Sequence, residues 1–165
     1  DYLTGIGNRR YFYQNAKQEF SRSKREFLNL SLLILDLDKF KQINDSHGHS
    51  AGDKVLIAFA NTVKKLLRDY DIFARIGGEE FAILLPSTGI EEGSLIAERI
   101  RQSVAAMAIP IEHESITVTT SIGLVDIKSD VNIWNYKDLP FNEELIFEKA
   151  VSGLSTKQID SILEL

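Results

Sequence analysis

Apolar residues along this chain form two kinds of pattern, continuous runs and helical repeats. The run at 28–36 is nearly all apolar and ends in an acid, which is typical of a buried strand. Over 53–67, apolar residues recur every three or four positions, which predicts a long helix with one buried face. Two more apolar runs, 72–76 and 81–85, flank the sequence Gly-Gly-Glu-Glu and predict a hairpin.

The remaining segments continue this alternation of helices and strands. Residues 8–25 predict a polar helix with Asn8 as its N-cap and Phe12 and Phe20 as anchors, and 116–127 is β-branched and strand-like. The other predicted elements are a short helix at 38–46, a loop at 47–53, a helix at 91–107 that Ile109-Pro110 closes, a loop at 128–144 and an irregular helical segment at 145–163. The order βααββαβ predicts an α+β sandwich, with helices packed on a mostly antiparallel central sheet.

The composition indicates the size of the domain and argues against several classes of site. A chain of 165 residues suits one domain with its own core, and 44% hydrophobic with 26% charged residues is ordinary for a soluble globular protein. The net charge of −5 argues against a broad nucleic-acid-binding surface, although a local basic pocket for a phosphorylated small molecule is compatible with it. The absence of cysteine excludes disulfides and thiolate metal sites and fits a reducing compartment. No apolar run approaches the roughly 20 residues that a membrane span needs.

The glycine hairpin has two interpretations. In the first, Gly77 and Gly78 form an ordinary tight turn, because glycine reaches positive φ at little cost, and Glu79 and Glu80 are simply solvated. In the second, the hairpin strands lie beside the 28–36 strand, so Asp36 and Glu79 meet at one end of the sheet and form a magnesium site. Gly77 and Gly78 would then let a phosphate approach the backbone closely.

The residues after Asp36 could supply the other half of a phosphate site. Residues 37–40 open a helix, so their N–H groups lack intrahelical partners and can bind an anion. Lys41, one turn further, can add positive charge. Taken singly, however, Asp36 could be a helix N-cap and Lys41 a solvated side chain.

A second candidate pair, Asn44 and Asp53, brackets the sequence Asp-Ser-His-Gly-His-Ser-Ala-Gly. An Asn amide with an Asp carboxylate complements the acceptor and donors on the edge of guanine. The alternative is that Asn44 ends one helix and Asp53 caps the next. His47 and His49 lack a third nearby nitrogen ligand, and His113 is isolated, so we interpret the histidines as loop structure.

Four stretches of the chain match the motifs of one family in order and spacing. They are DYLTGIGNRR at 1–10, LDLDKFKQINDSHGHSAGD at 35–53, ARIGGEEF at 74–81 and TTSIGL at 119–124. Together they resemble the GGDEF family of diguanylate cyclase domains, in which Glu is an accepted replacement for Asp as the carboxylate ligand. The resemblance covers the chain to about residue 127. It implies a palm-type nucleotidyl cyclase-like fold in a single GGDEF domain over 1–165, excised from a larger sensory protein and located in the cytoplasm.

The resemblance also implies a reaction, in which two GTP molecules condense into cyclic di-GMP and two pyrophosphates. The implied ligands of Mg²⁺ or Mn²⁺ are Asp36, Glu79 and the Leu37 carbonyl, with Glu80 lining the same site. Residues implied to bind GTP are Asn44 and Asp53 at guanine, and Lys39, Phe40, Lys41, Gly77 and Gly78 at the phosphates. Each domain holds one GTP, so the implied catalytic unit is a homodimer.

Arg68 and Asp71 add a regulatory prediction. Arg68 lies nine residues before Gly77, as in the family's Arg-x-x-Asp inhibitory site for cyclic di-GMP, and Arg99 matches a secondary arginine of that site. Arginine suits such a site because its guanidinium binds guanine and phosphate in a bidentate manner. The alternative is an ordinary exposed helix end.

The C-terminal part, 128–165, departs from the family. Family members close with a segment whose Lys and Arg grip the GTP phosphates. Neither of two registers of LIFEKAVSGLSTKQIDSILEL keeps both basic residues, although Lys149 or Lys157 could compensate from a shifted register. Two functions therefore stay open: a cyclase, or a weak or inactive domain that senses GTP or cyclic di-GMP or mediates an interaction. A palm-type cyclase acting on one nucleotide is a third, against which the guanine pair and the full set of motifs argue.

Overall fold

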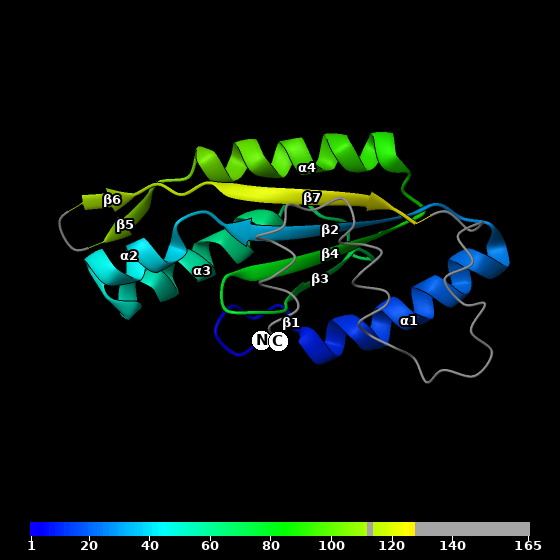
Figure 1. The fold of residues 1–165 in the computed structure, drawn as a ribbon, viewed down its shortest axis with the longest axis horizontal. Coiled ribbons are helices and arrows are strands. Elements are labelled where there is room, and N and C mark those ends of the chain that lie inside the picture. The colour runs from blue at the N-terminus through cyan, green and yellow to red at the C-terminus, as the bar shows by residue number, and fades with distance from the viewer. Residues whose placement is uncertain (112–113, 128–165) are drawn as a thin grey trace.

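The computed structural model describes residues 1–111 and 114–127, which form a five-stranded sheet covered by helices on both faces (Figure 1). The helices are α1 (Arg9–Glu26), α2 (Phe40–His47), α3 (His49–Lys64) and α4 (Ile90–Ala105). The strands of the sheet are β1 (Gly7–Asn8), β2 (Leu30–Leu37), β3 (Ile72–Arg75), β4 (Glu80–Pro86) and β7 (Thr120–Asp126), while β5 (Ile109–Ile111) and β6 (Glu114–Ile116) form a separate pair.

The sheet has the order β1-β3-β4-β2-β7, and only β1 and β3 pair in parallel among the described strands. The prediction of an α+β fold with a mostly antiparallel central sheet is therefore confirmed. Strand β2 is the centre of this arrangement, because it pairs with β4 on one side and with β7 on the other. The end of β2 thus lies beside two segments that are distant in the sequence.

Both faces of β2 are buried, which explains its nearly continuous apolar run. Leu33 and Leu35 belong to the core under α3 and α4, whereas Leu32 and Ile34 belong to the core under α1. Successive side chains of a strand point to opposite faces, so a strand covered on both sides needs apolar residues at every position. Asp36 interrupts this run close to the end of β2.

The predicted α1 helix is confirmed in detail. Asn8 is its N-cap, and its Oδ1 accepts a hydrogen bond of 2.9 Å from the Tyr11 N–H. Phe12, Ala16 and Phe20 are buried at a spacing of four residues, which places them along one face of the helix. The two phenylalanines anchor α1 on the sheet as predicted.

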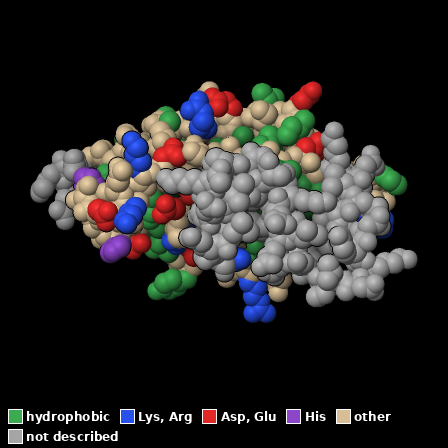
Figure 2. Space-filling view, viewed as in Figure 1, with side chains coloured by type: hydrophobic (Ala, Val, Ile, Leu, Met, Phe, Trp, Pro, Cys, Tyr) green, Lys and Arg blue, Asp and Glu red, His purple; other side chains and the backbone are tan. Residues whose placement is uncertain are grey.

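The predicted loop at 47–53 is wrong. His47 is the last residue of α2 and His49 the first of α3, so Gly48 alone connects the two helices. Its φ of 78° makes the sharp bend, and this left-handed conformation favours glycine. Figure 2 shows histidines on the surface at the α2–α3 end, among interspersed acidic and basic side chains. His113 lies outside the described residues.

The predicted strand at 116–127 is also wrong in its extent. Ile116 pairs with Ile109 in the β5–β6 hairpin, and the strand that joins the main sheet starts at Thr120. Ile109-Pro110 is accordingly part of a strand and does not close α4. The elements predicted at 128–144 and 145–163 lie outside the described residues. No described helix has the length and apolarity required to cross a membrane.

Candidate active site

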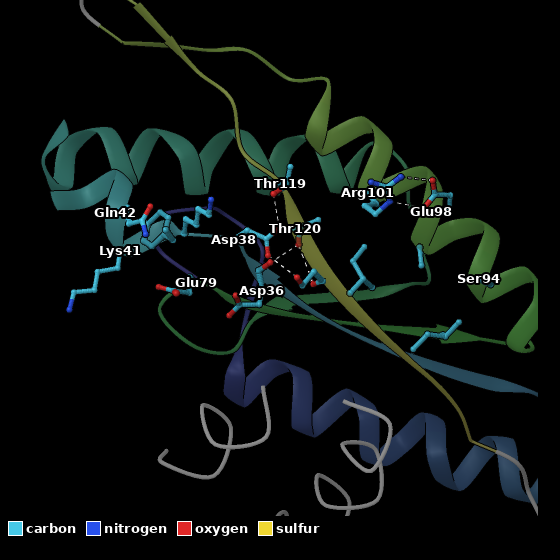
Figure 3. Close-up of a pocket in the computed structure, with 16 residues that line it drawn as sticks. Asp36, Asp38, Lys41, Gln42, Glu79, Ser94, Glu98, Arg101, Thr119 and Thr120 are labelled. Carbon is cyan, nitrogen blue, oxygen red and sulfur yellow. Dashed lines mark hydrogen bonds and ion pairs between the residues drawn. The ribbon is translucent and has the colours of Figure 1, made fainter. Parts of the chain in front are cut away.

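The ends of β2 and β4 bring the two predicted acidic metal ligands together. Asp36 pairs with Glu80 at the end of the β2–β4 ladder, and the Leu37 N–H donates to the Glu79 carbonyl over 3.3 Å. As a result, Asp36 and Glu79 line one groove of about 1170 Å³. Figure 3 shows both carboxyl groups at the end of this groove where α2 begins.

The donor set at this end fits magnesium. Asp36 and Glu79 are half-buried and offer carboxylate oxygens, while the Leu37 side chain is buried in the core, so only its backbone carbonyl could contribute. The described residues contain no group of three or more acids and histidines that could enclose a metal. Magnesium commonly takes one or two carboxylates and completes its shell with water and substrate phosphate, so two acids suffice.

Glu80 has a different environment from Glu79. It is only 6% exposed and does not line the groove, so the interpretation of Glu80 as solvated and the prediction that it lines the metal site are both wrong. Its carboxylate packs over Gly77, where an added Cβ would lie 2.2 Å from Glu80 Oε2. The structure therefore places Glu80 inside the hairpin, next to the groove and not within it.

Of the two hairpin glycines, Gly77 is explained by space and not by backbone conformation. Neither Gly77 nor Gly78 has a positive φ, so the tight-turn explanation is wrong. Gly77 makes room for Glu80, and Gly78 has open space around its Cα. Arg75 holds this tip, because its Nε and Nη2 donate to the Gly78 carbonyl over 3.1 and 2.7 Å. Arg75 Nη1 also lies 3.6 Å from Asp1 Oδ1, which attaches the tip to the first residues of the chain.

The start of α2 is suited to phosphate. The side chain of its N-cap residue, Lys39, makes no capping hydrogen bond to the helix, and the first turn contains no acidic residue. The first N–H groups of a helix lack intrahelical partners and attract anions. Lys39, Phe40 and Lys41 all line the groove. In Figure 3, however, the Lys41 side chain points away from Asp36 and Glu79.

Asn44 lies on α2 and Asp53 on α3, the two helices that meet at Gly48. The Asn44 side chain lies against Gly52, where a Cβ would be 2.0 Å from Asn44 Oδ1. Asp53 is exposed and lies in the second turn of α3, so it does not cap that helix. Burial lowers the pKa of Arg75, and the charge of Asp53 opposes this effect. Neither Asn44 nor Asp53 lines the groove itself.

The predicted inhibitory residues gather at the opposite end of β3. The Arg68 N–H donates to Asp71 Oδ2 over 2.8 Å within a turn beyond α3, so Arg68 is not at a helix end. Arg68 Nη2 donates to Glu92 Oε1 over 2.6 Å, and Arg99 Nη2 donates to the Leu66 carbonyl over 2.7 Å. Burial raises the pKa of Asp71, while the charges of the two arginines act in the opposite direction.

Sequence reasoning missed several residues of the groove. Asp38, Gln42, Thr119 and Ser121 line it, and so do Glu98 and Arg101 of α4. Arg101 donates to both Glu98 oxygens over 2.7 Å, which lowers the pKa of Glu98 to about 2. The sequence did contain a signal for three of them: Asp38 lies in the motif at 35–53, and Thr119 and Ser121 lie in the motif at 119–124.

Comparison with known proteins identifies the family. Residues 1–135 match the family model described as "Diguanylate cyclase, GGDEF domain". This chain is 44% identical over 156 residues to diguanylate cyclase DgcP of Pseudomonas aeruginosa, covering 93% of this chain and 22% of that protein. It is 40% identical over 126 residues to the response regulator PleD of Caulobacter vibrioides, covering 75% and 28%. The chain belongs to the GGDEF family and spans between about a fifth and two fifths of its first curated relatives.

Solved structures show the same fold. Diguanylate cyclase SiaD from Pseudomonas aeruginosa, in complex with its activator SiaC, has a TM-score of 0.82 at 33% identity, covering 98% of this chain and 58% of that chain. The GGDEF domain of DgcB from Caulobacter crescentus, in complex with c-di-GMP, has a TM-score of 0.75 at 29% identity, covering 78% and 75%. An active GGEEF domain of a diguanylate cyclase from Vibrio cholerae has a TM-score of 0.69 at 34% identity, covering 74% and 77%.

Proposed function

We propose that this domain condenses two molecules of GTP into cyclic di-GMP and two pyrophosphates, as part of a longer signalling protein in the cytoplasm. The observation that carries the proposal is the placement of Asp36 and Glu79 at the end of one groove, beside a helix start without a side-chain cap. The similarity to named diguanylate cyclases supports the same reaction.

Asp36, Glu79 and the Leu37 carbonyl would hold Mg²⁺ or Mn²⁺. When bound, such an ion lowers the pKa of a hydroxyl and neutralises charge on phosphate. The N–H groups at the start of α2 would bind the β- and γ-phosphates and thereby orient the α-phosphate. Gly78 has open space around it, so a phosphate can approach the backbone there.

Asn44 and Asp53 would select the base. The Asp53 carboxylate accepts hydrogen bonds from guanine N–H donors, and the Asn44 amide can donate to the guanine oxygen. Each domain would hold one GTP, whose 3′-hydroxyl attacks the α-phosphate of the other, so the working unit is a homodimer. Arg68, Asp71 and Arg99 would bind the product, cyclic di-GMP, as an inhibitor.

Incubation of the purified protein with GTP and Mg²⁺, followed by chromatography, tests the proposal. We expect cyclic di-GMP and pyrophosphate in a ratio of one to two. ATP serves as the control nucleotide, because it presents a donor where guanine has its oxygen. A protein that binds GTP but forms no cyclic di-GMP at any protein concentration would favour the alternative, a nucleotide-sensing domain. The assembled carboxylates weigh against that alternative.

A further inference from the structure

Residues 119–121, at the start of β7, are attached to the turn that joins β2 to α2. Thr119 Oγ1 donates to Asp38 Oδ2 over 2.6 Å, and Ser121 Oγ donates to Asp38 Oδ1 over 2.7 Å. The backbone is attached as well, because the Asp38 N–H donates to the Thr119 carbonyl over 3.0 Å. Thr120 Oγ1 donates to the Asp36 carbonyl over 2.8 Å. These contacts extend the β2–β7 pairing beyond its last ladder pair, Leu37 with Thr120.

The attached turn contains an unfavourable backbone conformation. Lys39 has a φ of 58°, in the left-handed region, and has no side-chain cap contact. This region is unfavourable for a non-glycine residue, so it persists where surrounding contacts fix it. Asp38 directly precedes Lys39, and its two carboxylate oxygens accept hydrogen bonds from Thr119 and Ser121. The contacts with β7 therefore fix the point from which α2 starts.

Asp38 differs from the proposed metal ligands although it lines the same groove. Each Asp38 oxygen accepts a short hydrogen bond from a hydroxyl group, and charge-assisted bonds of this kind are the stronger ones. These bonds direct the carboxylate toward β7, as Figure 3 shows. The same contacts attach the backbone on both sides of Leu37, where the proposed metal ligands lie.

We propose that Asp38, Thr119 and Ser121 form a clamp that positions the triphosphate-binding turn, with Asp38 as a positioning residue and not a metal ligand. This inference rests on the proposed GTP site. The clamp holds the left-handed Lys39 and directs the first N–H groups of α2 into the groove. Loss of the clamp weakens GTP binding because the turn must then be ordered by the nucleotide itself.

The test measures binding and turnover of a set of variants. The binding probe is a GTP analogue with a methylene between the α- and β-phosphates, in the presence of Mg²⁺, followed by calorimetry. Asp38→Ala should lower the affinity for the analogue about tenfold, and Thr119→Val should lower it about threefold to tenfold. Each substitution removes hydrogen bonds that involve the charged Asp38 carboxylate. With GTP itself, KM should rise by a similar factor, with a smaller change in kcat.

Conservative variants separate positioning from general destabilisation. Thr119→Ser keeps the hydroxyl and should restore the parent affinity. Asp38→Asn should stay within about threefold of the parent, because hydroxyl groups both donate and accept and can pair with the amide. Thr117→Val is the matched control: Thr117 is exposed two residues earlier and should tolerate the change.

The outcomes distinguish this inference from the proposed function. If the parent binds the analogue and forms cyclic di-GMP, but Thr119→Val and Asp38→Ala bind equally well, the clamp is wrong and the function stands. If Asp38→Asn is as inactive as Asp36→Asn, the charge of Asp38 matters and the positioning role is wrong. If the parent neither binds the analogue nor forms product, the proposed function fails and the clamp with it. Should Asp38→Ala not fold, the Thr119→Val and Thr119→Ser pair decides.

Discussion

The two ends of strand β3 carry two kinds of candidate site. At the Gly77 end, Glu80 packs against Gly77, and Arg75 holds the Gly78 carbonyl, so backbone and partly buried contacts fix the tip. At the Arg68 end, the side-chain contact to Glu92 joins two exposed residues. β3 has four residues, so the two ends are roughly 13 Å apart along the strand.

This difference suits the two proposed roles. Catalysis benefits from groups that are already held in place, because no reorganisation is then needed during the reaction. An inhibitory site must instead bind and release its ligand, and exposed ion pairs exchange readily because water and salt screen them. The comparison predicts that substitutions at the Gly77 end abolish activity or stability, whereas those at the Arg68 end adjust the affinity for cyclic di-GMP.

The largest expected effect is loss of the carboxylates at the Gly77 end. Glu79→Gln should lower cyclic di-GMP synthesis at least about a hundredfold, because an amide is a poor ligand for magnesium. Asp36→Asn should behave in the same way. Synthesis is measured by chromatography, and binding of cyclic di-GMP by calorimetry serves as the control, since the Arg68 end should be unaffected. Parent-like turnover in either variant would refute the assignment of metal ligands.

The next largest effect concerns the packing of the hairpin tip. Gly77→Ala would place a Cβ 2.2 Å from the buried Glu80 carboxylate. We expect the free energy of unfolding to fall by about 1–3 kcal/mol, as for other overpacked sites. Gly78→Ala is the matched control, because its Cα faces open space and its φ is not positive. Equal stabilities in urea would show that Glu80 moves away at no cost.

Arg68→Ala tests the opposite end. The substitution removes the guanidinium that we propose contacts phosphate or guanine, so cyclic di-GMP should bind about tenfold more weakly or worse. Binding of GTP should stay nearly unchanged, because the groove does not include Arg68. Calorimetry with both nucleotides on both proteins measures this. If the affinity for cyclic di-GMP is unchanged, Arg68 does not form an inhibitory site.

The smallest expected effect is a gain. The Glu92 carboxylate accepts a hydrogen bond from the Arg68 guanidinium, so it competes with any anionic ligand for that group. Glu92→Gln should therefore tighten cyclic di-GMP binding by about twofold to fivefold, within the range expected for an exposed ion pair. Glu91→Gln is the control, since Glu91 is also exposed in the first turn of α4. A gain of equal size in both variants would indicate a general charge effect and not competition for Arg68.

Local pattern was sufficient for much of the fold. The apolar run of β2, the helical repeat of α3 and the two runs around Gly-Gly-Glu-Glu predicted the main elements, because burial on a fixed face imposes a fixed period. The meeting of Asp36 with Glu79 followed once the hairpin was placed beside β2. The helix boundary at His49 could not be predicted in this way, because a single residue, Gly48, makes the whole bend.

What the sequence determined by itself was the set of elements, the GGDEF motifs and the candidate ligands, because each depends on neighbouring residues. The tertiary structure decided which distant residues support them. Asp38 and Thr119 are 81 positions apart, and Arg68 and Glu92 are 24 apart, so no periodicity relates the members of either pair. The role of Gly77 was decided in the same way, by the close approach of the Glu80 side chain. Strand register and packing bring such groups together, and these depend on the whole sheet and not on any local segment.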